Sequence, residues 1–270
     1  MITLTLTTPP SVPLEAEVLS PDVVATLDTA EIRALPVYLG KRQMRVDDFF
    51  EVAGAKSDAL EIRGDVSKVK WIGRRMSRGR VTVVGDVGMH LGAQMSGGTI
   101  VVSGNASDWV GAEMSGGAIR IGGNAGGQVG AAYRGSLTGM TDGTIVIGGS
   151  AGLEVGARMK RGTIAIAGMV RDFAGLQMKG GTIVTGGAEL RTGAWMARGT
   201  IITLSQIQML PTFRPASSDN PTFLRLYAKS LGKVGFDLPF DERHGTYRRY
   251  TGDVSVPGKG EILVWHANGS

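Results

Sequence analysis

Short alternations of apolar and polar residues recur along the middle of the chain, each following a glycine. In runs such as "RVTVV", "TIVVS", "AIRIG" and "TIIT", the second residue is Val or Ile and the fourth is Val, Ile or Thr. Side chains two residues apart lie on one face of a strand, so each run predicts a short β-strand with one buried face. The expected inward residues are Val81, Ile100, Ile119, Ile145, Ile164, Ile183 and Ile201, followed two positions later by Val83, Val102, Ile121, Ile147, Ile166, Thr185 and Thr203.

These strands belong to a longer repeat that is centred on a methionine. A glycine follows each methionine by three residues and usually precedes it by three. The methionines are 19 residues apart except for one step of 26 and a final step of 18, and they are Met76, Met95, Met114, Met140, Met159, Met178 and Met196. This length is too short for a helix–turn–helix repeat of about 34 residues. It suits one coil of a β-solenoid, so we expect about seven stacked coils, with an insertion at residues 133–139.

The methionine column allows two interpretations. Soft thioether sulfurs can bind copper(I), which would make the column a metal site. The sequence contains no cysteine and no histidine cluster that would complete such a site. Methionine is also an adaptable filler of irregular cores, and we therefore predict that the column packs the interior of the coils.

The third residue of each predicted strand should point outward, but four of the seven are Val or Ile. They are Thr82, Val101, Arg120, Val146, Ala165, Val184 and Ile202. A bare apolar stripe is unusual on a soluble protein, so we expect the C-terminal segment or another subunit to cover it. The alternative is that branched side chains simply suit a strand.

The flanks do not carry the repeat, which divides the chain into three parts. We expect an N-terminal cap at residues 1–60, the repeat domain at 61–205, and a C-terminal extension at 206–270 that wraps the stack or contacts partner subunits. In the first part, "ITLTLT" alternates like a strand, and Asp28 with Glu31 forms a capping-box pattern that opens a short helix. In the last part, prolines, phenylalanines and charged residues predict strands and a short helix.

Composition narrows the possible functions. Glycine accounts for 42 of the 270 residues, about twice the usual share, and the repeat explains it. The absence of cysteine excludes disulfides and iron–sulfur clusters on this chain. The first residues lack a basic segment followed by an apolar one, and no apolar run is long enough for a membrane span, so we expect a cytoplasmic protein. No GxSxG, HExxH or P-loop motif occurs, and we predict no catalytic residue and no metal ligand.

Positive charge gathers at one corner of the predicted coils. The net charge is +5, and basic residues follow the methionine in the first copy and in the last three. We predict that these residues, the predicted basic edge, bind an anionic chain; they are Arg78, Lys160, Arg161, Lys179 and Arg198. A solvated edge that keeps the protein soluble is an equally good interpretation. The charge is too diffuse and the aromatics too few to indicate nucleic-acid binding.

The sequence resembles the C subunit of formylmethanofuran dehydrogenase. The resemblance lies in the GxxMxxGxIxxxG repeat, the lead-in "LPVYLGKRQMRVDDFFEVAG" and the tail "LPTFR…RYTGDVSVPGKGEILV", and so covers nearly the whole chain. The repeat alone also resembles the C-terminal domain of glutamate synthase, and the tail with "GKGEI" separates the two. The resemblance implies a right-handed β-helix that works inside a larger complex.

The resemblance also implies a function that depends on partners. In the bacterial formyltransferase/hydrolase complex, formyl moves from formyl-tetrahydromethanopterin to a methanofuran analogue and is released as formate. The chemistry would belong to an amidohydrolase-like, metal-dependent subunit and a formyltransferase subunit, and a further subunit would complete the hetero-oligomer. This chain would be a scaffold, and its basic residues could guide the polyglutamyl tail of the cofactor. The alternatives are a subunit of a tungsten or molybdenum dehydrogenase and a structural domain like that of glutamate synthase.

Overall fold

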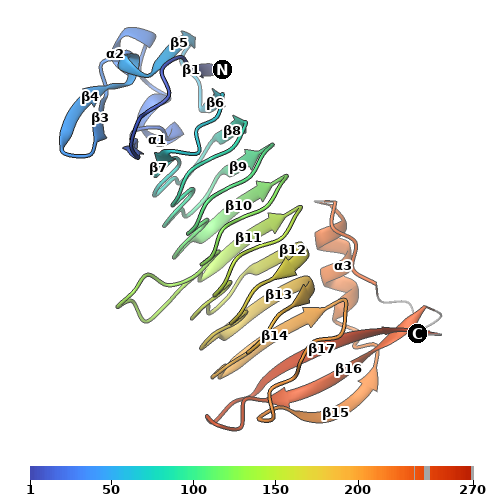
Figure 1. Ribbon diagram of the computed structural model, residues 1–270. Coiled ribbons are helices and arrows are strands. Elements are labelled where there is room, and N and C mark those ends of the chain that lie inside the picture. Colours follow the sequence, from blue (N-terminus) through green and yellow to red (C-terminus); the bar gives the residue numbers. More distant parts are fainter. Residues whose placement is uncertain (234, 240–243, 269–270) are drawn as a thin grey trace.

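The computed structural model describes residues 1–233, 235–239 and 244–268. In this part of the chain, thirteen strands form one large mixed sheet and four shorter ones form a second sheet near the N-terminus. Figure 1 shows the large sheet as a ladder that runs the length of the molecule, with non-repetitive segments at both ends. The prediction from the sequence is confirmed in that the chain is mostly β, with few helices.

The predicted strands form the centre of the ladder. Each copy of the repeat contributes one strand, which pairs in parallel with the strand of the next copy, so that Ile100 lies between Val81 and Ile119. A second column of parallel bridges runs from Val66 to Val170, also one copy at a time. The strands are β8 (Arg80–Val84), β9 (Thr99–Val102), β10 (Ser115–Ile121), β11 (Asp142–Ile147), β12 (Thr163–Val170), β13 (Lys179–Ala188) and β14 (Arg198–Thr203).

Methionine and glycine pack against each other between neighbouring copies. All seven repeat methionines are fully buried, as we predicted. A Cβ atom at Gly117 would lie 2.7 Å from Met95 Cε, and one at Gly111 would lie 2.6 Å from Ile145 Cδ1. Real side chains do not approach so closely, so the two glycines of each copy leave the space that a methionine and an isoleucine of adjacent copies occupy.

Six of the seven copies also turn at two positions where non-glycine residues adopt left-handed backbone, and the copy with Met140 does so at one. Bulky residues rarely have positive φ, because the Cβ atom crowds the backbone. In the described part of the chain thirteen non-glycine residues do so, and all occupy one of these two positions. The first position is two residues before the glycine that precedes the methionine, and it holds Trp71, His90, Trp109, Gln128, Glu154, Phe173 and Arg191. The second position is immediately before the methionine, and it holds Arg75, Gln94, Glu113, Arg158, Gln177 and Trp195.

The N-terminal segment extends the sheet beyond the first copy. Strand β1 (Ile2–Leu6) pairs in parallel with β6 (Ala59–Arg63) and antiparallel with β5 (Phe50–Gly54). Helix α2 (Thr29–Arg33) begins at the predicted capping box, in which Asp28 accepts from the amides of Ala30 and Glu31. The other elements are β2 (Leu14–Glu15), α1 (Pro21–Val24), β3 (Pro36–Leu39), β4 (Arg42–Arg45), the 3₁₀ helix η1 (Val46–Asp48) and β7 (Val69–Lys70).

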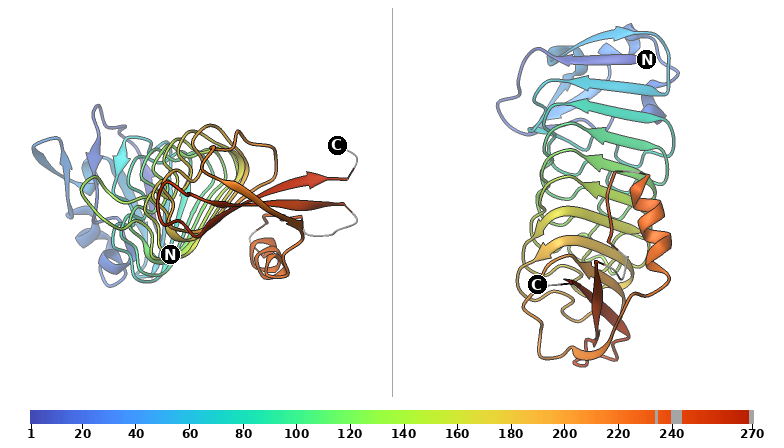
Figure 2. Two further views of the ribbon diagram at one scale, coloured as in Figure 1. Left: turned by 90° about the horizontal axis from the view of Figure 1, so that it is seen from below. Right: turned by 90° about the vertical axis from the view of Figure 1, so that its right-hand side faces the viewer.

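The C-terminal segment closes the opposite end of the stack. Strand β17 (Gly260–Ala267) continues the parallel order beside β14, and β16 (Gly245–Gly252) and β15 (Arg214–Asp219) then follow antiparallel. Helix α3 (Leu224–Gly232) leaves this end and lies along the flank of the stack, as the right-hand view of Figure 2 shows.

Helix α3 and the C-terminal strands cover most of the outward apolar stripe. A second hydrophobic cluster joins the stripe to Leu224 and Leu231 of α3, to Tyr247 and to Leu263. The covered stripe residues are between 0% and 6% exposed and are Val146, Ala165, Val184 and Ile202. The predicted cover is therefore confirmed for these four copies, and the C-terminal segment supplies it.

Candidate anion-binding corner

The predicted basic residues lie at the turn that follows each repeat methionine. At this turn, the backbone amide of one copy donates to the methionine carbonyl of the copy before it. Lys160 N is 2.8 Å from Met140 O, and Lys179 N is 2.8 Å from Met159 O. The side chains of successive copies therefore leave the backbone one above another, about 4.8 Å apart.

Four of the five predicted residues come together here, on three consecutive copies. We name Lys160, Arg161, Lys179 and Arg198 the basic corner; all four are exposed, and Lys179 pairs in register with Arg198. In residues 1–233, 235–239 and 244–268, the side chains of Lys160, Arg161 and Arg198 have no salt bridge or hydrogen-bond partner. The corner thus presents positive charge that the described part of this chain does not neutralise.

Arg78 lies apart from the basic corner, at the first copy. Four repeat steps, about 19 Å, separate its position from that of Arg161. The same position in the three copies between them holds Gly97, Gly116 and Asp142, so no continuous basic edge forms. Burial raises the pKa of Asp22, but hydrogen bonds from Ser77 and the nearby charge of Arg78 outweigh it and leave the pKa below its usual value. Arg78 therefore lies beside Asp22 of the N-terminal segment, apart from the basic corner.

Lys179 also holds the insertion of the long repeat step. Its Nζ atom donates to the carbonyl oxygen of Leu137 at 2.7 Å. The charge of Lys179 is thus oriented by residues 133–139, whereas the neighbouring cations extend into solvent.

A shallow pocket adjoins the corner on its C-terminal side. Its volume is about 410 Å³, and it is lined by Gln177, Lys179, Trp195, Ala197 and Val256. The indole of Trp195 is 50% exposed, so an apolar surface lies directly beside the positive charges. An anionic chain with apolar segments could contact both.

Asp253, in the C-terminal tail motif "RYTGDVSVPGKGEILV", holds Trp195 in place. Asp253 is only 2% exposed and accepts from the amide of Trp195 at 2.9 Å and from Ser255 N and Oγ at 2.8 and 2.7 Å. Burial would raise the pKa of the Asp253 carboxyl, but these hydrogen bonds outweigh it and lower the pKa. Trp195 was not among the predicted site residues, although it stands where most other copies carry Arg, Gln or Glu before the methionine.

Curated relatives match only part of this chain. The C subunit of a molybdenum-containing formylmethanofuran dehydrogenase 1 from Methanothermobacter marburgensis is 45% identical over 83 residues, which are 30% of this chain and 21% of the relative. The C subunit of a tungsten-containing formylmethanofuran dehydrogenase 2 from Methanothermobacter wolfeii is 42% identical over 96 residues, 34% of this chain and 36% of the relative. The matches thus span a fifth to about a third of these relatives. No protein-family model matches the chain.

A solved structure matches the chain over nearly its full length. It is the crystal structure of the formyltransferase/hydrolase complex from Methylorubrum extorquens with methylofuran; a chain of it is 35% identical to this one with a TM-score of 0.89. The match covers 97% of this chain and 98% of that one. This chain belongs to the C-subunit family of formyltransferase/hydrolase and formylmethanofuran dehydrogenase complexes. The family match includes the C-terminal segment that builds the Trp195 pocket.

This member of the C-subunit family also has an aromatic cluster that sequence analysis missed. Trp71, His90 and Trp109 occupy the same left-handed position of successive copies, and the rings of Trp71 and His90 stack 4.0 Å apart. Tyr133 stacks on Trp109 at 4.8 Å, and its hydroxyl lies 2.9 Å from His90 Nδ1. The common spacing of 19 residues was the signal that could have revealed the cluster. Through Tyr133, the aromatic cluster anchors the insertion.

The burial of His90 and the charges around it determine its charge state. Burial, followed by the nearby charges of Lys70 and Arg74, lowers the pKa of His90 to about 4. Burial also raises the pKa of the Tyr133 hydroxyl. Both groups are therefore neutral near pH 7, and the pair acts as a hydrogen-bonded anchor for the insertion.

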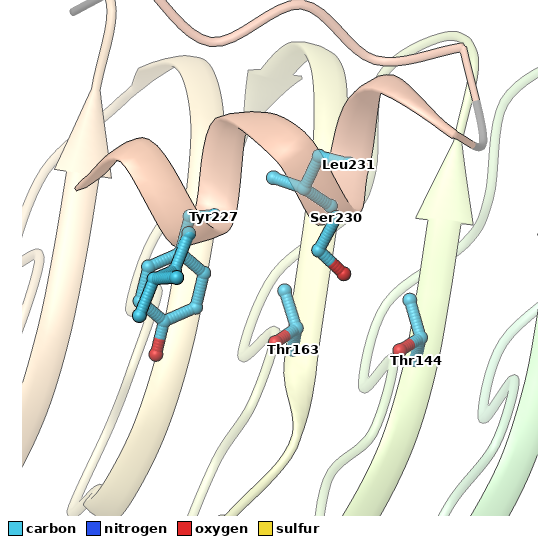
Figure 3. A pocket seen from close by; sticks show the side chains of 6 residues that line it. Thr144, Thr163, Tyr227, Ser230 and Leu231 are labelled. Carbon is cyan, nitrogen blue, oxygen red and sulfur yellow. The ribbon is translucent and has the colours of Figure 1, made fainter. Parts of the chain in front are cut away.

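A second pocket in this C-subunit family member lies between helix α3 and the stack. It holds about 300 Å³ and is lined by Thr144, Thr163, Leu226, Tyr227, Ser230 and Leu231 (Figure 3). Tyr227 reaches the next threonine of the column, since Thr182 Oγ1 donates to the Tyr227 hydroxyl oxygen at 2.8 Å. The pocket has hydroxyl groups and no charged side chain, so it is a less suitable anion site than the basic corner.

Two further findings concern metals and membranes. Across the described ranges, no three His, Asp or Glu side chains are grouped so that they could hold a metal ion. None of the helices in those ranges has the length and apolar character that a membrane crossing requires.

Proposed function

We propose that this chain is a scaffold subunit of a cytoplasmic formyltransferase/hydrolase complex. In that complex, formyl moves from formyl-tetrahydromethanopterin to a methanofuran analogue and is released as formate. The observation that carries the proposal is the match over 97% of this chain and 98% of a chain from such a complex. The alternative, a subunit of a tungsten or molybdenum dehydrogenase, is supported by relatives that match about a third of the chain.

We infer that the repeat domain is a right-handed β-helix, the rigid form that a scaffold requires. Support comes from strands of successive copies that pair in parallel at equivalent positions, and from a second column of parallel bridges. Because each copy contacts mainly its neighbours, stiffness along the axis comes from continuous hydrogen-bond ladders.

The partners follow from the same proposal. An amidohydrolase-like, metal-dependent subunit and a formyltransferase subunit would carry out the reactions, and a further subunit would complete the complex. Affinity purification of the tagged chain from its native host tests this directly, by identifying the proteins that copurify. We expect both enzymes; a partner set with neither a formyltransferase nor a metal-dependent hydrolase would overturn the proposal.

We further propose that the basic corner guides the polyglutamyl tail of the methanofuran analogue. Glutamyl carboxylates are anionic, and the exposed cations of three neighbouring copies fit a linear polyanion: Lys160, Arg161, Lys179 and Arg198. Arg78 is excluded from this role by its distance along the stack. The corner would orient the tail, while the reacting formyl group would be bound by other subunits.

Charge reversal tests this role. In the assembled complex, Lys160→Glu with Arg161→Glu should weaken binding of a polyglutamate peptide by about tenfold or more, because two attractions become repulsions. The matched control reverses another exposed Lys–Arg pair, Lys41 and Arg42, in the N-terminal hairpin. Equal binding by the two double variants would refute the corner as the tail site.

A further inference from the structure

The insertion of the 26-residue step projects from the stack on the side away from helix α3. Figure 1 shows it as a loop between β10 and β11, with α3 against the opposite flank. The other five steps between repeat methionines have no such insertion. The stacking of copies therefore does not require the insertion, and its presence calls for a separate role.

One end of the insertion is fixed by the aromatic cluster. The amide of Tyr133 donates to Glu113 Oε1 at 3.2 Å, while its ring packs on Trp109 and its hydroxyl meets His90. These contacts reach back over the two preceding copies.

The other end is fixed by cations of the following copies. Arg158 Nη1 donates to the carbonyl oxygen of Ser136 at 2.5 Å, and Lys179 Nζ donates to that of Leu137 at 2.7 Å. The amide of Gly139 also donates to Arg158 O at 3.0 Å. Charge-assisted bonds are stronger than neutral ones, so the loop is held in one shape before any partner binds.

The rigid loop presents an apolar side chain to solvent. Leu137 is 74% exposed, although both of its neighbours along the loop take part in hydrogen bonds that hold it. Two exposed cations lie near it, Arg134 on the loop itself and Lys179, which bonds the Leu137 carbonyl oxygen. An ordered leucine within a positive rim complements an apolar pocket with an acidic rim.

We propose that residues 133–139 form a docking knob for a partner subunit. Leu137 inserts into an apolar pocket of that subunit, and Arg134 pairs with an acidic rim. The inference rests on the proposed function in one respect, which is that the chain assembles with other subunits. The partner is a different subunit, because a second copy of this basic knob would bring like charges together.

The test uses the assembled complex and two matched leucine variants. The partner subunits are bound to the purified full-length chain, and the dissociation constant is measured for wild type, Leu137→Asp and Leu226→Asp. Leu226 is 72% exposed on α3 and therefore controls for placing a charge at an exposed leucine. We expect Leu137→Asp to weaken binding by about tenfold or more, since the change removes a buried apolar contact and places a charge in an apolar pocket. Leu226→Asp should bind like wild type.

Further measurements distinguish a lost docking contact from unfolding of the chain and from failure of the proposed complex. Leu137→Asp should leave the urea midpoint of the isolated chain unchanged, and Arg134→Glu should weaken assembly mainly at low salt. Wild-type affinity in Leu137→Asp, or equal losses in both leucine variants, would overturn the docking knob while leaving the proposed complex intact. Failure of the wild-type chain to assemble at all would overturn both. Self-association that Leu137→Asp abolishes would assign the knob to a second copy and refute this inference.

Discussion

Crowding at a repeat glycine can be separated from backbone strain, because the chain contains a matched pair. Gly92 and Gly40 both have a φ of +61°. A Cβ atom at Gly92 would lie 2.6 Å from Ile119 Cδ1, 3.0 Å from Ile100 Cδ1 and 3.2 Å from Met95 Sδ, whereas one at Gly40 would meet nothing within 4 Å. Alanine at Gly40 therefore reports only the left-handed conformation, and alanine at Gly92 reports that plus the packing between copies.

The expected magnitudes differ by more than the error of the measurement. Left-handed backbone costs a non-glycine residue about 1–2 kcal/mol, which we expect for Gly40→Ala. Overpacking adds about 1–3 kcal/mol, so Gly92→Ala should lower the free energy of unfolding by about 2–5 kcal/mol. Ile119→Val removes the Cδ1 atom that would collide, and should recover about 1 kcal/mol in the Gly92→Ala background although it destabilises the wild type.

Urea unfolding, followed by circular dichroism, measures these differences. The dependence of the unfolding free energy on urea should be the same for the wild type and all four variants, so that shifts in midpoint report stability alone. The control applies to the same folding unit, because Val37 of the Gly40 hairpin belongs to the main hydrophobic cluster. Equal losses for Gly40→Ala and Gly92→Ala, or simple additivity of Gly92→Ala and Ile119→Val, would refute the packing argument.

Three further predictions concern the anchors at both ends of the stack. His90 has a folded pKa of about 4, below its unfolded value near 6.5. Its contribution to stability should therefore be constant above pH 6.5 and fall by about 1–2 kcal/mol, after allowance for solvent screening, as the pH decreases toward 4. His90→Gln, which introduces the residue found at this position two copies later, should remove that part of the pH dependence in urea titrations. Asp253 has a lowered pKa, so its contribution to stability should be complete above pH 4 and lost as the pH falls through the folded pKa. Asp253→Asn should quench or shift Trp195 fluorescence at pH 7. An unchanged spectrum would contradict the role of Asp253 in holding Trp195. Leu231→Ala on α3 should cost about 2–4 kcal/mol because the side chain is 2% exposed, and thermal unfolding that matches wild type would contradict its burial against the stripe.

The repeat and its core could be predicted because the information is local and occurs seven times. The period of two fixed which strand residues point inward, and the methionine spacing fixed the register, so Ile100 was matched with Val81 and Ile119 without any coordinates. The buried Thr185 and Thr203 fit the same pattern because each donates its hydroxyl proton to a carbonyl two residues later.

The site was predicted less well, because it depends on contacts between segments that the repeat does not specify. The basic corner followed from the alignment of copies, but Gly97, Gly116 and Asp142 in the intervening copies should have separated Arg78 from it. The place of Trp195 depends on Asp253, which lies 58 residues later in the non-repetitive tail. The anchoring of the insertion by Tyr133 likewise depends on side chains of other copies.

Both ends of the stack change from parallel to antiparallel pairing, at β1 with β5 and at β17 with β16. The repeat does not continue past these antiparallel ribbons, and the outermost strand β15 contains Pro215, which has no backbone N–H to donate to a further strand. The molecule is thus a ruler of fixed length, on which any two attachment points are separated by a whole number of steps of about 4.8 Å. Deleting one uninterrupted repeat would shorten that ruler by a single graduation and leave both terminations unchanged.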